Sequence, residues 1–212
     1  MAIGGGAMGG QILRAPPWTA AHVRAAVAAV YSRVATNPAE TFRFPVGPAL
    51  AHRLGYPDDL LQSLPPTAIE SFTGVACPVL AAHLAPGEGV LDLGSGAGLD
   101  ALIAARQVGP SGRVVGVDLS AAMVAKAQAT AAATGVVGVA FSRAGAEALP
   151  FPGHAFDAVL VNGLLNLTPD KSIVVQEIHR VLRSGGRAVV AEIVTDGTQP
   201  PVSMKNLEDW FR

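Results

Sequence analysis

The chain has 212 residues, a formal net charge of −1 and a single cysteine, and half of its residues are hydrophobic. This length fits one domain with an added segment, and one cysteine excludes an intrachain disulfide. The near-neutral charge argues against nucleic-acid and membrane partners, and the lack of a long uninterrupted apolar run or leader pattern predicts a cytoplasmic protein.

The first 17 residues are predicted to form a flexible tail. Gly4–Gly9 formally matches the cofactor-binding pattern G-x-G-x-x-G, but no strand precedes it, as such a motif requires. Thr19 is expected to cap a helix from about Ala20 to Ala35, because apolar residues recur there at helical spacing.

Residues 18–83 are predicted to form a helical cap on the substrate side. After the first helix this segment is rich in proline and aromatic residues, and short helices are expected at 47–54, at 57–63 and from about residue 67. Ligands of open α/β sheets bind at the carboxyl ends of the strands. We therefore expect the cap to close over the mouth of a cofactor site and to admit a small-molecule substrate.

A buried strand, a glycine turn and a helix are predicted around residue 94. The apolar run 89–93 is too short for a helix, whereas residues 99–108 carry apolar side chains at helical spacing. Glycine lets the backbone turn sharply and approach a ligand, and the following helix offers free N–H groups. The three glycines of this turn are Gly94, Gly96 and Gly98.

Two acids flank this turn in the sequence. Asp92 stands two residues before the first glycine, where a carboxylate suits a ligand with a cationic amino group better than a pyrophosphate. The spacing G-x-G-x-G also differs from the dinucleotide fingerprint G-x-G-x-x-G. Asp118 ends a second apolar strand about 20 residues later, where an acid binds the two ribose hydroxyls of either ligand class. Asp92 therefore favours S-adenosylmethionine over NAD.

Helices and strands alternate through the rest of the chain. We expect a helix at 121–133, strands at 137–142 and 158–161, a helix at 171–182, a turn at Ser184–Gly186 and a strand at 188–194. This alternation predicts an α/β, Rossmann-like fold with a mainly parallel sheet of five strands. Residues 84–196 would form the cofactor-binding domain, and 197–212 a tail or a truncated helix that begins near Leu207.

Five motifs in this order resemble the class I S-adenosylmethionine-dependent methyltransferases. They are Val90–Asp100, Val114–Ser120, Glu147–Phe151, Phe156–Val159 and Val181–Gly186. The resemblance implies S-adenosyl-L-methionine as the cofactor and a methyltransferase activity. The family usually completes its sheet with a further helix and an antiparallel hairpin, which this chain lacks. Either the chain is a fragment, or its last strand has an uncovered edge that needs the tail or a partner chain, such as a second copy in a homodimer.

Within that class the chain resembles the arsenite methyltransferases and their type-11 relatives. The similar segments are Leu91–Gly98, Val108–Val114 and Asn162–Lys171. The arsenite enzymes carry a cysteine where this chain has Gly163, and their other arsenic-binding cysteines are also missing. Trivalent arsenic is held by a set of thiolates, which Cys77 alone cannot form. The resemblance therefore predicts the fold and the cofactor, but not an arsenic substrate.

The predicted cofactor-binding residues lie at the ends of the strands. They are Asp92, Gly94, Ser95, Gly96, Gly98, Asp118, Leu119, Met123, Ala146, Glu147 and Asn162. Many relatives place an acid at the position of Gly145 to bind the adenine amino group, so we expect Ala146 and the region of Glu147 to select adenine here. No metal site is predicted.

Three residues are candidates for a catalytic role. Asn162, at the end of the fourth strand, would face the methyl group and orient the substrate, although a turn residue that closes a strand is an equal interpretation. An acceptor hydroxyl or amine would need a base, and His52 is the histidine that we would test. Tyr31 could reach the cofactor carboxylate from the cap, or belong to the core.

Several functions remain open. The leading hypothesis is methyl transfer to a small molecule by in-line displacement, in which the protein aligns the reacting atoms and excludes water. The alternatives are a domain that binds S-adenosylmethionine or S-adenosylhomocysteine without turnover, an arsenite-type relative and a nicotinamide-dependent oxidoreductase, which the glycine spacing disfavours.

Overall fold

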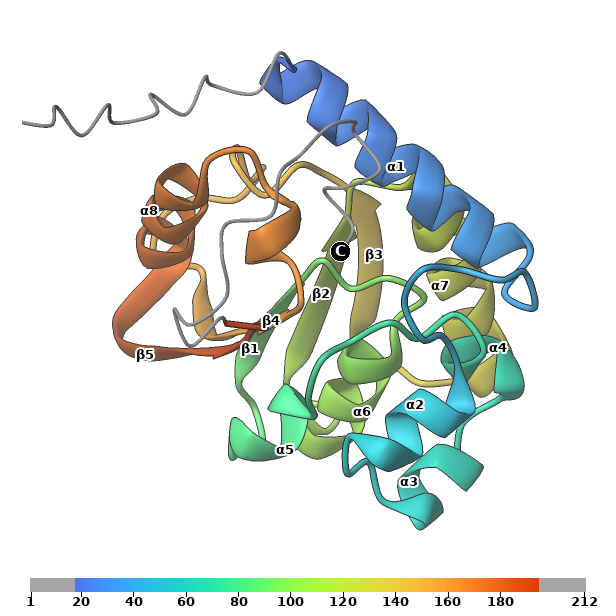
Figure 1. Ribbon diagram of the computed structural model, residues 1–212. Coiled ribbons are helices and arrows are strands. Elements are labelled where there is room, and N and C mark those ends of the chain that lie inside the picture. The colour runs from blue at the N-terminus through green and yellow to red at the C-terminus, as the bar shows by residue number, and fades with distance from the viewer. Residues whose placement is uncertain (1–17, 195–212) are drawn as a thin grey trace, which may run out of the picture.

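The computed structural model describes residues 18–194 (Figure 1), so the predictions for the N-terminal tail and for the helix near Leu207 lie outside the described residues. A five-stranded sheet occupies its centre, with the strand order β3-β2-β1-β4-β5. All neighbouring strands are parallel, which confirms the predicted Rossmann-like α/β fold. The strands are β1 (Gly89–Leu93), β2 (Arg113–Asp118), β3 (Val139–Arg143), β4 (Phe156–Asn162) and β5 (Leu182–Ala191).

Helices cover both faces of this sheet. The described α-helices are α1 (Ala20–Thr36), α2 (Pro48–Arg53), α3 (Asp58–Gln62), α4 (Pro66–Ile69), α5 (Pro78–Ala81), α6 (Leu99–Val108), α7 (Ala121–Thr134) and α8 (Lys171–Val181), and a 3-10 turn, η1, spans Leu165–Leu167. The winding direction reverses at β1, which lies between β2 and β4. Ligands of open α/β sheets bind at such a reversal, beyond the carboxyl ends of the strands.

Two apolar cores lie on opposite faces of the sheet. On one face, Val90 and Leu160 pack with Leu102 of α6 and with α7. On the other, Leu91 and Val161 pack with residues of α8. Figure 1 shows α8 on one side of the sheet and α6 and α7 on the other. Because β1 is buried on both faces, its sequence is a nearly continuous apolar run, and the acid Asp92 inside it stands out.

The segment 18–83 divides into two parts. The short helices α2, α3 and α4 pack Leu50, Leu61 and Ile69 into the core beside α6. The long helix α1 runs separately, against α7 (Figure 1). Thr19 caps α1 as predicted, by accepting a hydrogen bond from the backbone N–H of His22. The segment that was predicted to form one cap therefore consists of two parts, which pack against different helices. The domain boundaries 18–83 stay a prediction.

The largest difference from the predicted elements is at β5. This strand begins at Leu182, directly after α8, instead of at residue 188. Its pairing with β4 shifts register between Phe156 and Ala158, opposite the glycines that were expected to form a turn. Gly185 has a φ of +78°, which lets the strand bulge locally while it remains paired. At β3, the strand starts two residues later than expected, after Gly138 with a φ of +76°.

Candidate functional site

The glycine turn is pinned to the neighbouring strand β2. The N–H groups of Gly94 and Ser95 both donate to the carbonyl of Val117, at 2.8 and 2.9 Å. Gly96 has a φ of +53° and nothing within 4 Å of the position that a Cβ would occupy, so the backbone faces open space there. Gly98 differs, because a Cβ would lie 2.8 Å from the ring of Phe141. Gly98 therefore serves the packing of α6, and Gly96 leaves room for a ligand.

Asp118 is fixed beside this turn by backbone donors. One carboxylate oxygen accepts from the N–H of Gly96 at 2.9 Å, and the other from the N–H of Ser120 at 2.8 Å. Burial raises the pKa of Asp118, and the backbone hydrogen bonds oppose that shift. The carboxylate is thus held in one orientation at the end of β2, as the predicted ribose contact requires.

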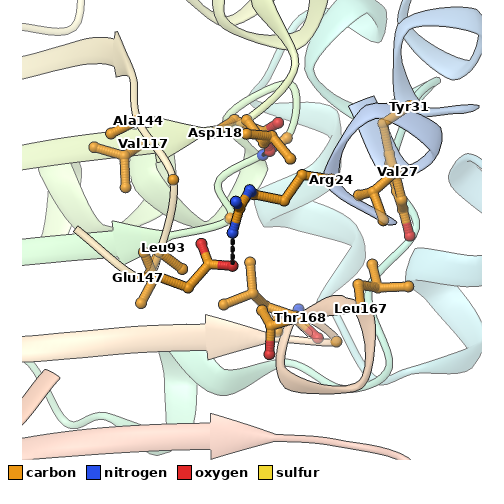
Figure 2. A pocket seen from close by; sticks show the side chains of 18 of the residues that line it. Arg24, Val27, Tyr31, Leu93, Val117, Asp118, Ala144, Glu147, Leu167 and Thr168 are labelled. Atoms are coloured by element: carbon orange, nitrogen blue, oxygen red, sulfur yellow. Dashed lines mark hydrogen bonds and ion pairs between the residues drawn. The ribbon is translucent and has the colours of Figure 1, made fainter. Parts of the chain in front are cut away.

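A cavity of about 730 Å³, open to solvent, lies in front of Asp118. Six of the predicted cofactor residues besides Asp118 line it: Gly94, Gly96, Leu119, Ala146, Glu147 and Asn162. Tyr31 lines it too. The rest of the wall comes from α1, from the segment after β4, from the strand ends and from Thr73, and it includes Arg24, Val27, Leu93, Val117, Ala144, Leu164, Leu167 and Thr168 (Figure 2). The structure therefore brings residues from six separate parts of the chain around one cavity, since Thr73 also lines it.

Arg24 crosses this cavity from α1. Its guanidinium forms an ion pair with Glu147 at 3.2 Å, and Figure 2 shows the side chain extended between the helix and the loop. Arg24 was not predicted from the sequence. The available signal is its spacing, since residues 24, 27 and 31 lie on one helical face and all three line the cavity.

A second, smaller cavity of about 370 Å³ adjoins the first at the turn, and the two share Thr73, Gly94, Gly96 and Asn162. Asp92, Ser95, Asp100 and Asn162 line it, together with residues 71–74 of the N-terminal segment. Asp92 and Asp100 are only 2% and 5% exposed. The Oδ2 atom of Asp92 and the Oγ atom of Ser95 are buried without a hydrogen-bond partner. Buried polar atoms are rarely left unpaired, so both suit a polar ligand.

Asn162 joins this small cavity to the N-terminal segment. Its Oδ1 accepts from the backbone N–H groups of Val75 and Ala76, at 2.8 and 3.2 Å. Its Nδ2 donates to Asp100 Oδ2 at 3.0 Å and lies within hydrogen-bond distance of Tyr56 Oη and the Ala76 carbonyl. The Tyr56 hydroxyl donates to Asp100 Oδ1 at 2.7 Å. The amide of Asn162 is therefore fully engaged within the protein, and its predicted contact with the methyl group stays a prediction.

The ionisation of this cluster is governed by burial. Burial, opposed by hydrogen bonds from Asn162 and Tyr56, raises the pKa of Asp100 to about 6. Burial and the neighbouring charge of Asp100 raise the pKa of Asp92 well above its usual range. Burial and Asp100 also raise the pKa of the Cys77 thiol to about 11, so this cysteine is a poor nucleophile.

Three predicted site residues lie away from both cavities. The imidazole of His52 is 48% exposed and pairs with Asp58 at 2.8 Å, because α2 turns its apolar face to α6 and its polar face to solvent. Met123 is fully buried in a small core with Val34. Gly98 packs against Phe141, as described above. The structure therefore does not bring His52, Met123 or Gly98 to a cavity wall.

Tyr31 reaches the large cavity, but it is also part of the core between α1 and the following loop. Its ring stacks on that of Phe44, with 5.9 Å between the centroids. Burial, with a smaller contribution from Asp118, raises the pKa of the Tyr31 hydroxyl above its usual range. The phenol therefore stays protonated at neutral pH and can donate a hydrogen bond into the cavity.

Two wider features of the described chain bear on the kind of site. Between residues 18 and 194, no group of three or more His, Cys, Asp or Glu side chains could hold a metal ion. In the same range, no helix combines the length and the apolar character needed to cross a membrane.

The comparisons with known proteins agree with one another. Residues 84–212 match the family model described as "Methyltransferase domain". An arsenite methyltransferase of Halobacterium salinarum is 39% identical over 152 residues, which make up 71% of this chain and 38% of that protein. The ubiquinone/menaquinone biosynthesis C-methyltransferase UbiE of Xanthomonas campestris is 39% identical over 127 residues, 58% of this chain and 50% of that protein.

A solved structure shows the same similarity in three dimensions. The crystal structure of CrArsM, an arsenic(III) S-adenosylmethionine methyltransferase of Chlamydomonas reinhardtii, aligns with a TM-score of 0.51 and 32% identity. The alignment covers 68% of this chain and 48% of the algal protein. The chain thus spans half or less of the length of these relatives.

Proposed function

The chain belongs to the methyltransferase domain family, whose model matches residues 84–212, and from this premise we propose that it transfers a methyl group from S-adenosyl-L-methionine to a small-molecule acceptor. The observation that carries the proposal is the carboxylate of Asp118, held by the N–H groups of Gly96 and Ser120 at the edge of the large cavity. A fixed acid in this position pairs with two ribose hydroxyls.

The residues around the turn fit this cofactor. The open space at Gly96 leaves room for the ligand beside the backbone, and Leu119 and Ala146 offer apolar surface for an adenine ring. The unpaired carboxylate oxygen of Asp92 suits a positively charged ligand. When bound, S-adenosylmethionine supplies a methyl group on a positively charged sulfur. The protein's own contribution is to align the acceptor with that group and to exclude water.

The acceptor is proposed to be a small, largely apolar molecule that carries its own nucleophilic atom. Beyond the residues assigned to the cofactor, the lining of the large cavity includes the apolar side chains of Val27, Leu164 and Leu167 and the ring of Tyr31, and its polar members are Arg24, Thr73 and Thr168. No histidine, lysine or cysteine lines it among residues 18–194. Without such a base, an acceptor that is already ionised or intrinsically nucleophilic is favoured.

Arsenite is not the acceptor that we propose, although two relatives carry that activity in their names. Cys77 is the single cysteine of these 212 residues and lines neither cavity. A soft metalloid needs several thiolates. The relatives named UbiE, which act on carbon, show that the family also includes acceptors of another kind.

A second candidate is a domain that binds the cofactor without turnover. The engaged amide of Asn162, and the absence of histidine, lysine and cysteine from the wall of the large cavity among residues 18–194, favour it. Formation of S-adenosylhomocysteine with any acceptor would exclude this candidate. We also propose a cytoplasmic location and a homodimer that pairs through β5, the edge strand on which Val190 is 45% exposed. Light scattering measures the mass in solution, and a monomer would contradict the dimer.

The test is a calorimetric titration of S-adenosylhomocysteine into the protein and into Asp118→Ala, with NAD as the control ligand. Binding to the unchanged protein should weaken at least about 100-fold in the variant, because two ribose hydrogen bonds to a charged acceptor are lost. Asp59→Ala, an exposed acid on α3, is the matched control and should bind normally. Binding of NAD, or no binding of S-adenosylhomocysteine to the unchanged protein, would contradict the proposal.

A further inference from the structure

Arg24 supplies the positive charge at the wall of the large cavity. Among residues 18–194, it is the one lysine, arginine or histidine that lines this cavity. It shares a face of α1 with Val27 and Tyr31, and Figure 2 shows its side chain extending from the helix into the cavity. The side chain is 40% exposed, so the guanidinium is accessible to a molecule that enters from solvent.

The contact between Arg24 and Glu147 leaves room for a second anion at the guanidinium. In the described chain it joins one nitrogen, Nη1, to Glu147 Oε1 at 3.2 Å. This distance exceeds the roughly 2.7–2.9 Å of close charge-assisted hydrogen bonds, and a guanidinium offers five N–H groups. A partly exposed ion pair also contributes little to stability. An ionised oxygen group of a ligand can therefore bind Arg24 beside Glu147 or in its place.

The surroundings of Arg24 make its charge selective. Val27 lies one turn further along α1, Leu167 lines the same cavity, and Thr73 and Thr168 add hydroxyl groups but no charge. An anion that enters such surroundings loses hydration and needs a counter-charge, whereas a neutral apolar molecule needs none. An ionised ligand in this cavity therefore depends on Arg24.

We propose that Arg24 is a specificity-determining residue, which selects acceptors that combine an apolar body with an ionised oxygen group, a carboxylate or a phenolate. The inference rests on the proposed function and specifies its acceptor. An acceptor that is already ionised has no proton to lose, so it fits a cavity wall without histidine, lysine or cysteine among residues 18–194.

The two acids that line the cavity in the described chain act on such an anion in different ways. Asp118 already accepts hydrogen bonds from the N–H groups of Gly96 and Ser120, which partly balance its charge. Glu147 competes with the ligand for Arg24, since both are anions. Removal of the Glu147 charge should therefore strengthen the binding of an acid, whereas removal of the Arg24 charge should weaken it. If the ion pair only held α1 in place, both changes would act in the same direction.

The experiment uses two apolar acids, 2-naphthoate and 4-phenylbutanoate, and the neutral primary amide of each. Every probe is titrated by calorimetry at pH 7 into the protein, with and without saturating S-adenosylhomocysteine. Under both conditions the unchanged protein should bind at least one acid at least about tenfold more tightly than the amide of the same shape, because a charge-assisted contact is gained.

Three variants and a control assign this preference to Arg24. In Arg24→Gln the acid and its amide should bind within about twofold of each other, whereas Arg24→Lys keeps the charge and should retain a preference of at least about threefold. Glu147→Gln should bind the acid at least about threefold more tightly than the unchanged protein does. Arg53→Gln, exposed on α2 and outside both cavity walls, is the matched control and should bind as the unchanged protein does.

The outcomes separate this inference from the proposed function. Equal affinities of acid and amide, or no binding of either acid to the unchanged protein, would overturn the inference while S-adenosylhomocysteine still binds. No binding of S-adenosylhomocysteine would overturn the proposed function, and the titrations without it would still test Arg24. Weaker acid binding in both Arg24→Gln and Glu147→Gln would show that the ion pair only positions α1, which also overturns the inference. If circular dichroism shows that Arg24→Gln is unfolded, the direction of the change in Glu147→Gln decides.

Discussion

The two sides of the glycine turn hold their acids by different means. On the side of the large cavity, Asp118 is fixed by backbone N–H groups of Gly96 and Ser120, which are available whether or not a ligand is present. On the side of the small cavity, Asp92 and Asp100 depend on each other's ionisation and on side chains from distant elements. Asp118 is a hydrogen-bond acceptor whose orientation is fixed before a ligand binds, whereas Asp92 and Asp100 are buried acids without a neighbouring cation in the described chain. The same turn therefore lies beside an acid with a fixed orientation and beside acids whose charge is not neutralised.

The largest effect on stability is expected from Gly98→Val, because both cavities lie beside the glycine turn that this residue ends. Gly98 has a φ of +93°, and a Cβ would lie 2.8 Å from Phe141. Strain at a positive φ and overpacking together should lower the free energy of unfolding by about 4 kcal/mol. Gly135→Ala, at a positive φ with nothing within 4 Å, should cost only about 1 kcal/mol. Chemical denaturation measures both, and similar losses would show that the contact with Phe141 is unimportant.

The next effect is a pH dependence of stability to which Asp100, on the small-cavity side, contributes. The folded-state pKa of Asp100, about 6, lies above that of an unfolded aspartate. Its stabilising contribution is therefore complete below pH 4 and is lost as the pH rises through 6. The contribution is at most roughly 3 kcal/mol. Denaturation of the ligand-free protein at several pH values should show this slope, and Asp100→Asn should reduce it, while the raised pKa values of Asp92 and Asp118 maintain the rest. Parallel pH profiles for the two proteins would contradict the assignment.

A smaller effect should have opposite sign on the two sides of the turn. Asp118→Ala leaves the N–H groups of Gly96 and Ser120 without an acceptor, and we expect it to destabilise the ligand-free protein by about 1–2 kcal/mol at pH 7. Asp92→Asn removes a buried acid with an unpaired oxygen, and the free energy of unfolding should stay equal or increase by up to about 1 kcal/mol. Chemical denaturation measures both variants. Equal losses of stability in Asp118→Ala and Asp92→Asn would contradict the difference that we infer between these two acids.

The smallest effect concerns a residue outside both cavities. His52→Gln changes an exposed side chain that pairs with Asp58. Stability should change by less than about 0.5 kcal/mol, and the affinity for S-adenosylhomocysteine should not change. A weakened affinity in this variant would restore the sequence-based hypothesis that His52 acts in the site.

The sequence predicted those parts of the site whose contacts are local. Asp118 and the glycine turn follow from short motifs at the ends of adjacent strands, and the parallel sheet follows from the alternation of elements. Asp100 was overlooked as a site residue because its partners Tyr56 and Asn162 lie 44 and 62 residues away. An acid in the first turn of a helix also has an ordinary explanation in the helix dipole. The sequence feature that could have identified Asp100 is its position in an otherwise mostly apolar helix, since almost every other residue of α6 is apolar and buried.

The start of β5 shows a second limit of sequence patterns. The glycines at 185 and 186 predict a turn, because glycine usually interrupts a strand. In the structure, β5 remains paired with β4 across this region through a shifted register. Pairing with β4 keeps this segment in a strand, and β4 lies in another part of the chain, where a local sequence pattern cannot show it.

The hydrogen bonds of Asn162 also determine when the site can assemble. Its amide joins Val75 and Ala76, which precede it by 87 and 86 residues. During synthesis on a ribosome, the N-terminal segment and the first two strands emerge well before β4 supplies this partner. Contacts between such distant residues form slowly, because a long loop must first close. The small cavity is therefore completed late in folding, and until then the acid in α6 and the loop before α5 have no amide to join them.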